Sequence, residues 1–78
     1  MKLNGKVAWV LGASSGIGAA VARELASRGC TVAISARREE QLREVSQGRM
    51  LVVPLDVTDA ASVMAAAARV HEELGPID

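Results

Sequence analysis

The sequence predicts an α/β fold in which three strands of one parallel sheet alternate with three helices. The first indication is that short apolar runs, rich in β-branched residues, alternate with stretches of helical spacing. The second is the segment LGASSGIG at residues 11–18, a glycine-rich turn between the first apolar run and the first helical stretch. Right-handed crossovers then give the spatial strand order 3-2-1. A chain of 78 residues forms one domain at most.

The first strand and helix flank the glycine-rich turn. Residues 6–11 (KVAWVL) are typical of a strand that is buried on both faces. Residues 16–28 change to helical spacing, and Gly29 is placed to end that helix. Its apolar stripe is expected to contain Ile17, Val21 and Leu25.

The second pair of elements is shorter and more polar. Residues 31–36 (TVAISA) predict a strand, and residues 38–47 predict a helix with Leu42 and Val45 on a narrow apolar stripe. Gly48 is expected to stop this helix.

A third strand and helix follow. Residues 50–55 (MLVVPL) predict a strand, in which Pro54 favours the strand's end or the sheet's edge because it lacks a ladder donor. Thr58 or Asp59 can cap a final helix through Leu74. The apolar side of that helix is expected to contain Val63, Ala67, Val70 and Leu74, with Gly75 and Pro76 ending it. Residues 76–78 then resemble the approach to a fourth strand beside the first.

Composition narrows the classes of partner. Nine basic and nine acidic residues cancel, so the chain is not expected to bind nucleic acid. No apolar run approaches the roughly 18 residues of a membrane span, and the N-terminus does not resemble a signal peptide, so we expect a cytoplasmic protein. Cys30, the single cysteine, is expected to be a buried structural thiol, and His71 an exposed surface residue. No metal site is expected.

The glycine turn predicts a binding site for phosphate. Gly12 would allow a sharp exit from the strand, Gly16 the close approach of a pyrophosphate, and Gly18 tight packing of the helix. The amide of Ile17 would face the phosphate oxygens at the helix N-terminus, where Ser14 and Ser15 can add hydroxyl donors. The spacing is neither GxGxxG nor that of a phosphate-binding loop with lysine. An ordinary helix start capped by Ser15 is the alternative.

The residues after the second strand indicate which dinucleotide would bind. An NAD site would carry an acidic residue there to bind the ribose 2′-hydroxyl. Arg37 and Arg38 stand there instead, and a guanidinium suits a phosphate and a purine face, so NADP is expected and NAD is less favoured. A solvated charge at the start of a helix remains the alternative for Arg38.

Asp56 and Val57 follow the third strand, at the carboxyl edge where open parallel sheets bind ligands. Asp56 could accept a hydrogen bond from the adenine amino group, and Val57 could pack on the ring. Capping of the next helix is the alternative for Asp56.

Together these residues resemble the N-terminal part of a classical short-chain dehydrogenase/reductase. The family's TGxxxGIG pattern corresponds to residues 11–18, with Leu11 in place of the usual threonine, and its acidic adenine-contacting motif corresponds to Asp56-Val57. Arg37 resembles the residue of NADP-preferring members. The resemblance implies a Rossmann-type sheet, a nicotinamide dinucleotide as partner, and hydride transfer to or from an alcohol or carbonyl.

The catalytic residues of that family have no counterpart here. Its members use a serine, an asparagine and a Tyr-x-x-x-Lys pair beyond the fourth strand, whereas this chain contains no tyrosine. Lys2, Lys6 and Asn4 lie at the other end of the first strand. We therefore expect residues 1–78 to form the N-terminal part of one NADP-binding Rossmann domain without its catalytic half, inactive by itself and poorly soluble or partly folded when isolated.

Two other functions are the alternatives. A non-catalytic module could hold a nucleotide, or could self-associate by pairing the open edge of the first strand with another chain. A methyltransferase-like nucleoside binder is disfavoured, because it too would want an acidic residue where Arg37 and Arg38 stand.

Overall fold

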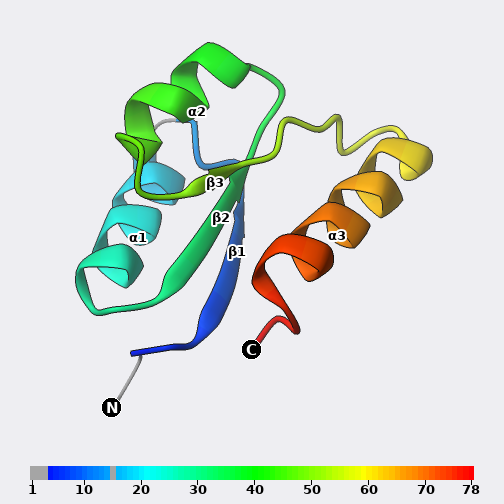
Figure 1. Cartoon of the computed structure of the whole chain (residues 1–78). Helices are drawn as coiled ribbons and strands as arrows, with labels where there is room; N and C mark the ends of the chain where they lie inside the picture. Colours follow the sequence, from blue (N-terminus) through cyan, green and yellow to red (C-terminus); the bar gives the residue numbers. More distant parts are fainter. Residues whose placement is uncertain (1–3, 15) are drawn as a thin grey trace.

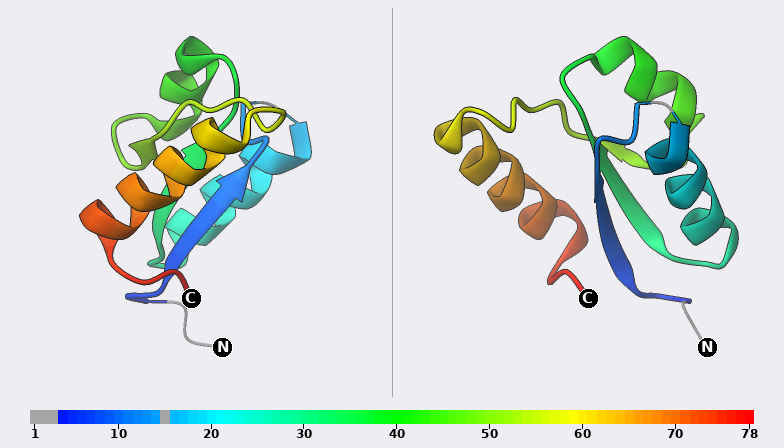
Figure 2. Two further views of the ribbon diagram at one scale, coloured as in Figure 1. Left: turned by 90° about the vertical axis from the view of Figure 1, so that its right-hand side faces the viewer. Right: turned by 180° about the vertical axis from the view of Figure 1, so that it is seen from behind.

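A computed structural model describes residues 4–14 and 16–78 of the chain. It contains a three-stranded parallel sheet with two helices on one face and one helix on the other (Figure 1). The elements in chain order are β1 (Val7–Leu11), α1 (Gly16–Ser27), β2 (Thr31–Ser35), α2 (Glu39–Ser46), β3 (Leu51–Val52) and α3 (Ala60–Leu74). The first described residues, before β1, and the C-terminus lie near the same end of the sheet (Figure 2).

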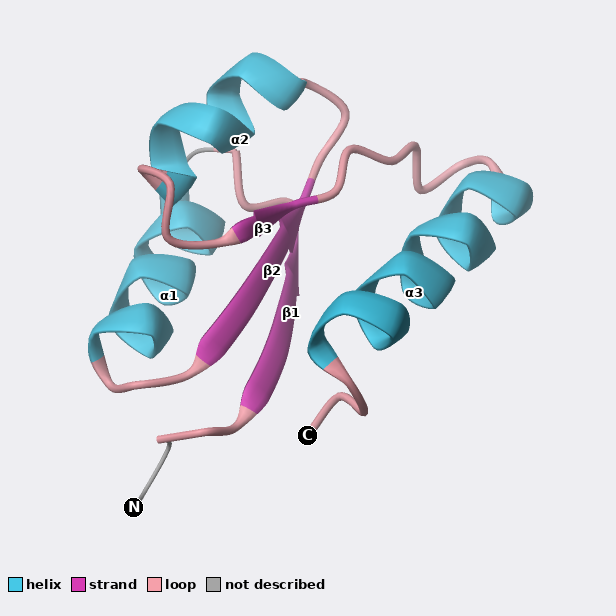
Figure 3. Cartoon of the chain, in the orientation of Figure 1, coloured by secondary structure: helices cyan, strands magenta, loops and turns pink. Residues whose placement is uncertain are grey.

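The sheet has the predicted architecture, with β2 between β1 and β3. Both pairs of strands are parallel, and β1 is aligned with β2 from Val7 opposite Thr31 to Leu11 opposite Ser35. The fold class and the strand order expected from the sequence are therefore confirmed. All three strands end at the same edge, where the turns into α1 and α2 and the segment leading to α3 begin (Figure 3).

β3 is shorter than the predicted strand at residues 50–55, although its pairing with β2 continues past its end. The amide of Val53 donates to the carbonyl of Ile34 at 2.9 Å, and that of Leu55 to the carbonyl of Ala36 at 3.0 Å. Pro54 stands between these two donors, so its nitrogen is directed away from β2, where no ladder partner is lost. This agrees with the expected edge position.

One core lies between the sheet and the pair α1 and α2, and it corrects the predicted face of α1. Ala19 and Ala22 are the buried residues of this helix, whereas the Ile17 side chain is 85% exposed and that of Val21 is 44% exposed. Leu25 packs partly against the core. The prediction of an Ile17–Val21–Leu25 stripe was wrong because small residues allow α1 to approach the sheet closely. The buried members of this core are Ala13, Ala19, Ala22, Val32, Ile34, Leu42 and Val45.

A second core lies between the sheet and α3, on the face opposite α1. Ala66 and Val70 of α3 are buried in it, and Val63 and Leu74 pack against it. Val63, Val70 and Leu74 agree with the predicted apolar side, but the alanine that faces the sheet is Ala66, one turn before Val70, and the predicted Ala67 is only half-buried. Asp59 caps α3, since its carboxylate accepts the amides of Ala61 and Ser62. The sheet residues of this core are Ala33, Val53 and Leu55, with Trp9 and Leu51 partly buried beside them.

The chain returns after α3 to the outer edge of β1. The amide of Asp78 donates to the carbonyl of Val7 at 2.9 Å, and the amide of Val7 donates to Oδ2 of Asp78 at 2.9 Å. Asp78 thus lies beside the first strand, on the side where the sequence predicted the approach to a fourth strand. In the described part of the chain, no helix combines the length and the apolar character that crossing a membrane requires.

Candidate functional site

The turn after β1 is attached to the end of β2. Gly12 has a φ of +73°, in the left-handed region that favours glycine, and its amide donates to the carbonyl of Ser35 at 2.7 Å. The amide of Ala13 reaches the same oxygen at 3.3 Å, and the Ala13 side chain is fully buried. The sharp exit from β1 is therefore held in place by the last residue of β2.

The N-terminus of α1 stands at the same edge of the sheet. Gly16, its first residue, has a φ of +62°, and open space surrounds the position where a Cβ would stand at Gly12 or at Gly16. A ligand can therefore approach both backbones closely. The amides of the first helical turn, including those of Ile17 and Gly18, have no acceptor within the helix. Ser15 lies outside the described residues.

Gly18 is the point where α1 meets the turn. A Cβ at residue 18 would overlap the carbonyl oxygen of Gly12 and would lie 3.0 Å from the Gly12 carbonyl carbon and 3.1 Å from the Cα of Ala13. The backbone contact requires a glycine at this position, and it fixes which face of α1 turns toward the sheet.

A pocket of about 340 Å³ opens between the glycine turn and the carboxyl ends of β2 and β3. It brings together residues that are more than 40 positions apart in the sequence, all at the edge where the strands end. Its lining residues are Gly12, Ser14, Ala36, Arg37, Arg38, Gln41, Leu55 and Val57. Of the predicted site residues, Gly16, Ile17, Gly18 and Asp56 do not line it.

Sequence reasoning missed Gln41 as a lining residue. Gln41 lies three residues after Arg38, which is the spacing that brings two side chains together on one side of a helix. That spacing was the available signal, but a glutamine in a polar helix has no special chemistry to single it out.

The two arginines contribute positive charge to this pocket. The ion pairs among the described residues join Glu24 to Arg28, Glu39 to Arg43 and Arg69 to Glu73, so neither Arg37 nor Arg38 takes part in one. Both arginines are exposed.

Arg38 is the N-cap residue of α2, but it makes no side-chain capping bond, and the acidic residues Glu39 and Glu40 occupy the first helical turn. The helix thus begins one residue later than predicted, and the carboxylates provide the charge that its N-terminus favours. Helix capping therefore does not involve the guanidinium of Arg38.

Asp56 follows β3 and belongs to a local hydrogen-bonded turn. Its Oδ1 accepts the amide of Thr58 at 2.9 Å and the Thr58 hydroxyl at 2.7 Å. These bonds, together with the positive charge of Arg37, hold the pKa of the Asp56 carboxyl below its ordinary value, against a smaller opposing effect of desolvation. Asp59 caps α3, so Asp56 is not the capping residue. Val57, 64% exposed, presents an apolar side chain to the pocket.

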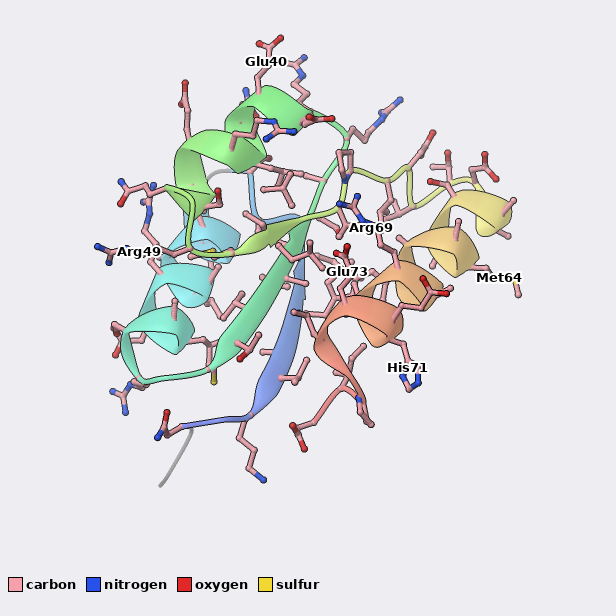
Figure 4. All side chains as sticks on the ribbon, viewed as in Figure 1. Glu40, Arg49, Met64, Arg69, His71 and Glu73 are labelled. Carbon is pink, nitrogen blue, oxygen red and sulfur yellow. The ribbon has the colours of Figure 1, made fainter. Side chains whose placement is uncertain are left out.

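The remaining reactive side chains lie elsewhere. His71 is exposed on the outer side of α3, where Figure 4 shows it pointing away from the sheet. Cys30 is half-buried against the core between the sheet and α1, less enclosed than the sequence predicted. No cluster of potential metal ligands occurs within residues 4–14 and 16–78.

This arrangement of a glycine turn, a helix N-terminus and basic residues at one sheet edge can be compared with known proteins. A family model described as short chain dehydrogenase matches residues 6–78. The chain belongs to the short-chain dehydrogenase family. The Rossmann-type fold and the family resemblance found in the sequence are both confirmed.

Individual relatives share this similarity along nearly the whole chain. The 2,3-dihydro-2,3-dihydroxybenzoate dehydrogenase of Bacillus subtilis is 42% identical over 82 residues, which are 97% of this chain and 31% of that protein. The D-threitol dehydrogenase of Mycolicibacterium smegmatis is 45% identical, over 99% of this chain and 32% of that protein. The chain thus spans about a third of the length of these dehydrogenases.

Solved structures of the family have the same fold. A short-chain type dehydrogenase/reductase from Mycobacterium marinum superposes with a TM-score of 0.94 at 37% identity, over 99% of this chain and 34% of the other. The L-sorbose reductase of Gluconobacter frateurii, complexed with NADPH and L-sorbose, superposes with a TM-score of 0.90 at 33% identity, over all of this chain and 33% of the other. The chain therefore corresponds to a nucleotide-binding portion of oxidoreductases that use a nicotinamide dinucleotide.

Proposed function

We propose that residues 1–78 are the N-terminal, NADP(H)-binding part of a short-chain oxidoreductase whose catalytic groups lie outside this sequence. The bound nicotinamide would supply the chemistry, a hydride transferred to or from an alcohol or carbonyl. This chain would bind and orient the adenosine end and the pyrophosphate. It contains no tyrosine and would be inactive by itself.

The observation that supports the proposal is the pocket at this sheet edge, whose lining residues include both arginines, Arg37 and Arg38, together with Gly12 and Ser14 of the glycine turn. Neither guanidinium takes part in an ion pair among the described residues, so both are available for a phosphate. The planar guanidinium can bind the 2′-phosphate in a bidentate manner, and it can also lie on the adenine face.

The other site residues would bind the remaining parts of the cofactor. The pyrophosphate would contact the amides of the first turn of α1 and the hydroxyl donors beside it. The residues assigned to this contact are Gly12, Ser14, Ser15, Gly16, Ile17 and Gly18. The Asp56 carboxylate would accept a hydrogen bond from the adenine amino group, and Val57 would pack on the ring. Both follow β3: the positive charge of Arg37 acts on the Asp56 carboxylate, and Val57 lines the same pocket as Arg37.

NAD is the less favoured cofactor because no carboxylate lines the pocket. Isothermal titration of the folded chain with NADPH and NADH tests this directly. We expect NADPH to bind at least about tenfold more tightly, the effect of one additional charge-assisted contact. Equal affinities would remove the argument for NADP, and a folded chain that binds neither at millimolar concentration would overturn the whole site.

An interaction module without catalysis is the second candidate, favoured by the position of β1 at the end of the sheet order. Asp78 covers the edge at Val7 only, and alternation along the strand directs the backbone groups of Trp9 and Leu11 to the same open side. The Leu11 side chain is 51% exposed there. A stable dimer in size-exclusion chromatography, without nucleotide affinity, would support this function.

The location proposed for this activity is the cytoplasm. The single cysteine supports it, because a chain without an intrachain disulfide suits a reducing compartment.

A further inference from the structure

A second pocket lies between the C-terminal ends of α1 and α2 and shares no residue with the candidate nucleotide site. We call it the α1–α2 pocket; its volume is about 300 Å³. Figure 4 shows Arg49, one of its residues, on the side of the molecule where these helices lie next to each other. The apolar lining residues are Ala26, Cys30, Val45 and Met50, and the polar ones are Arg23, Ser27, Ser46, Gln47 and Arg49.

The charge of the α1–α2 pocket is entirely positive. Arg23 and Arg49 line it, and no acidic side chain does. The ion pairs in the described part of the chain are formed by Arg28, Arg43 and Arg69. Neither Arg23 nor Arg49 takes part in one. Both cations therefore face the pocket without a carboxylate to neutralise them.

Arginines near a helix C-terminus can serve the helix alone, by binding its last carbonyls. Here many of those carbonyls already have donors. In α1 the carbonyl of Ala26 accepts the amide of Gly29, and that of Leu25 accepts the amide of Cys30, each at 3.1 Å. In α2 the carbonyl of Ser46 accepts the amide of Arg49 at 2.8 Å, and that of Arg43 accepts the amide of Gln47 at 3.1 Å. Helix capping thus does not account for the two guanidinium groups.

Gln47 adds a neutral donor at the rim. It is the C-cap residue of α2 with a φ of +48°, and it is the only residue other than glycine with a positive φ in the ranges 4–14 and 16–78. The sequence predicted that the helix would extend to residue 47 and stop at Gly48, but α2 ends at Ser46 and Gln47 is its C-cap residue. A glutamine in the left-handed region is disfavoured, and this turn places it on the pocket wall.

We propose that the α1–α2 pocket binds a small organic anion, with its oxyanion group between Arg23 and Arg49 and a short apolar body against Ala26, Val45 and Met50. The oxyanion can be a phosphate monoester or a carboxylate, since both accept the parallel donors of a guanidinium. The volume is at the lower end of ligand pockets, which suits a single ring or a short chain. This site is independent of the proposed dinucleotide site.

The test is an NMR titration of the 78-residue chain with phenyl phosphate, with benzoate, and with neutral benzyl alcohol. We expect the two anions to shift the amides of residues 26–30 and 46–50, and benzyl alcohol to shift them much less. Arg23→Gln and Arg49→Gln should each weaken anion binding by about threefold, as for an exposed charge contact. Arg28→Gln is the matched control, since it removes the same charge outside the pocket and should leave the affinity unchanged.

The titration also separates the two pockets. Phenyl phosphate can bind near Arg37, so Arg37→Gln is included, and it should leave the shifts at residues 46–50 intact. Tighter binding of phenyl phosphate than of benzoate would identify a phosphate ester as the preferred anion, and the reverse a carboxylate. Shifts confined to the glycine turn, equal binding of benzyl alcohol, or unchanged affinity in both Arg23→Gln and Arg49→Gln would overturn the proposal.

Discussion

The carbonyl oxygen of Gly12 occupies the space in which a Cβ atom at residue 18 would stand. Gly12 is the first residue of the turn after β1, and Gly18 lies in the first turn of α1. Their contact lets the N-terminus of α1 come as close to the sheet edge as two backbones allow. The position of the helix amides at the candidate nucleotide site therefore depends on this pair.

Gly18→Ala should destabilise the protein. In an exposed helix the same change would stabilise by about 1 kcal/mol, because alanine has the higher helix propensity. At residue 18 the added methyl group must displace backbone atoms of Gly12 and Ala13, and such overpacking costs typically 1–3 kcal/mol. Urea denaturation measures the net change. Ala20→Gly, at an exposed position of the same helix, is the control and should reduce stability only by its propensity, about 1 kcal/mol.

Most of the fold could be predicted from the sequence, because the apolar runs and the glycine stops are local signals. The face of α1 could not, since the hydrophobic pattern favoured Ile17 and Val21, whereas the Gly12–Gly18 contact turned Ala19 and Ala22 inward. The length of the third strand was overestimated because its pairing past Val52 is only partial.

At the candidate site, the sequence predicted which elements would meet but not every neighbour. Arg37, Arg38 and Val57 converge because the carboxyl ends of parallel strands share one edge. Gln41 joins them through the turn of α2, a relation that appears only once the helix is placed against the sheet.

Arg37→Ala should weaken the binding of NADPH by about tenfold and leave the binding of NADH nearly unchanged, because the lost charge-assisted bonds involve only the 2′-phosphate. Calorimetric titration with each cofactor gives the ratio of the variant's dissociation constant to that of the wild type. Arg28→Ala removes the same charge at the far end of α1 and should affect neither cofactor. Equal losses for NADPH and NADH in Arg37→Ala would argue that this residue contacts the adenine ring instead.

Asp56→Asn should reduce the pH dependence of stability at the acid end. The pKa of Asp56 is held below its ordinary value of 3.8 when the chain is folded, so the carboxylate contributes stability above that pH. The contribution is lost as the pH falls through the folded-state value. The wild type should therefore lose its advantage over Asp56→Asn below pH 3.8, as measured by urea denaturation at a series of pH values.

Asp59→Asn is the matched comparison for Asp56→Asn. It keeps a side-chain oxygen that can cap α3 and removes the same charge three residues away. If the free energy of unfolding of both variants differed from that of the wild type by the same amount at every pH, the hydrogen bonds between Asp56 and Thr58 would not explain the pH dependence.

Ser35→Ala should destabilise the sheet by about 1 kcal/mol, because it removes the acceptor of the only tryptophan. Nε1 of Trp9 donates to Oγ of Ser35 at 2.8 Å, and the Ser35 side chain is fully buried, so the hydroxyl has no access to water. The bond links β1 to β2 on the face that packs against α3. Because the chain has neither tyrosine nor phenylalanine, the fluorescence of Trp9 follows unfolding without interference.

The double-mutant cycle of Ser35→Ala and Trp9→Phe isolates this bond from the packing of the two side chains. Trp9→Phe removes the donor and part of the ring, so circular dichroism replaces fluorescence for that variant and for the double mutant. If the bond stabilises the fold, the double mutant should lose about 1 kcal/mol less stability than the sum of the two single losses, since the bond can be lost only once. Strict additivity would mean that the cost of Ser35→Ala comes from the cavity alone, and that β1 and β2 are joined by their backbone ladder without help from this pair.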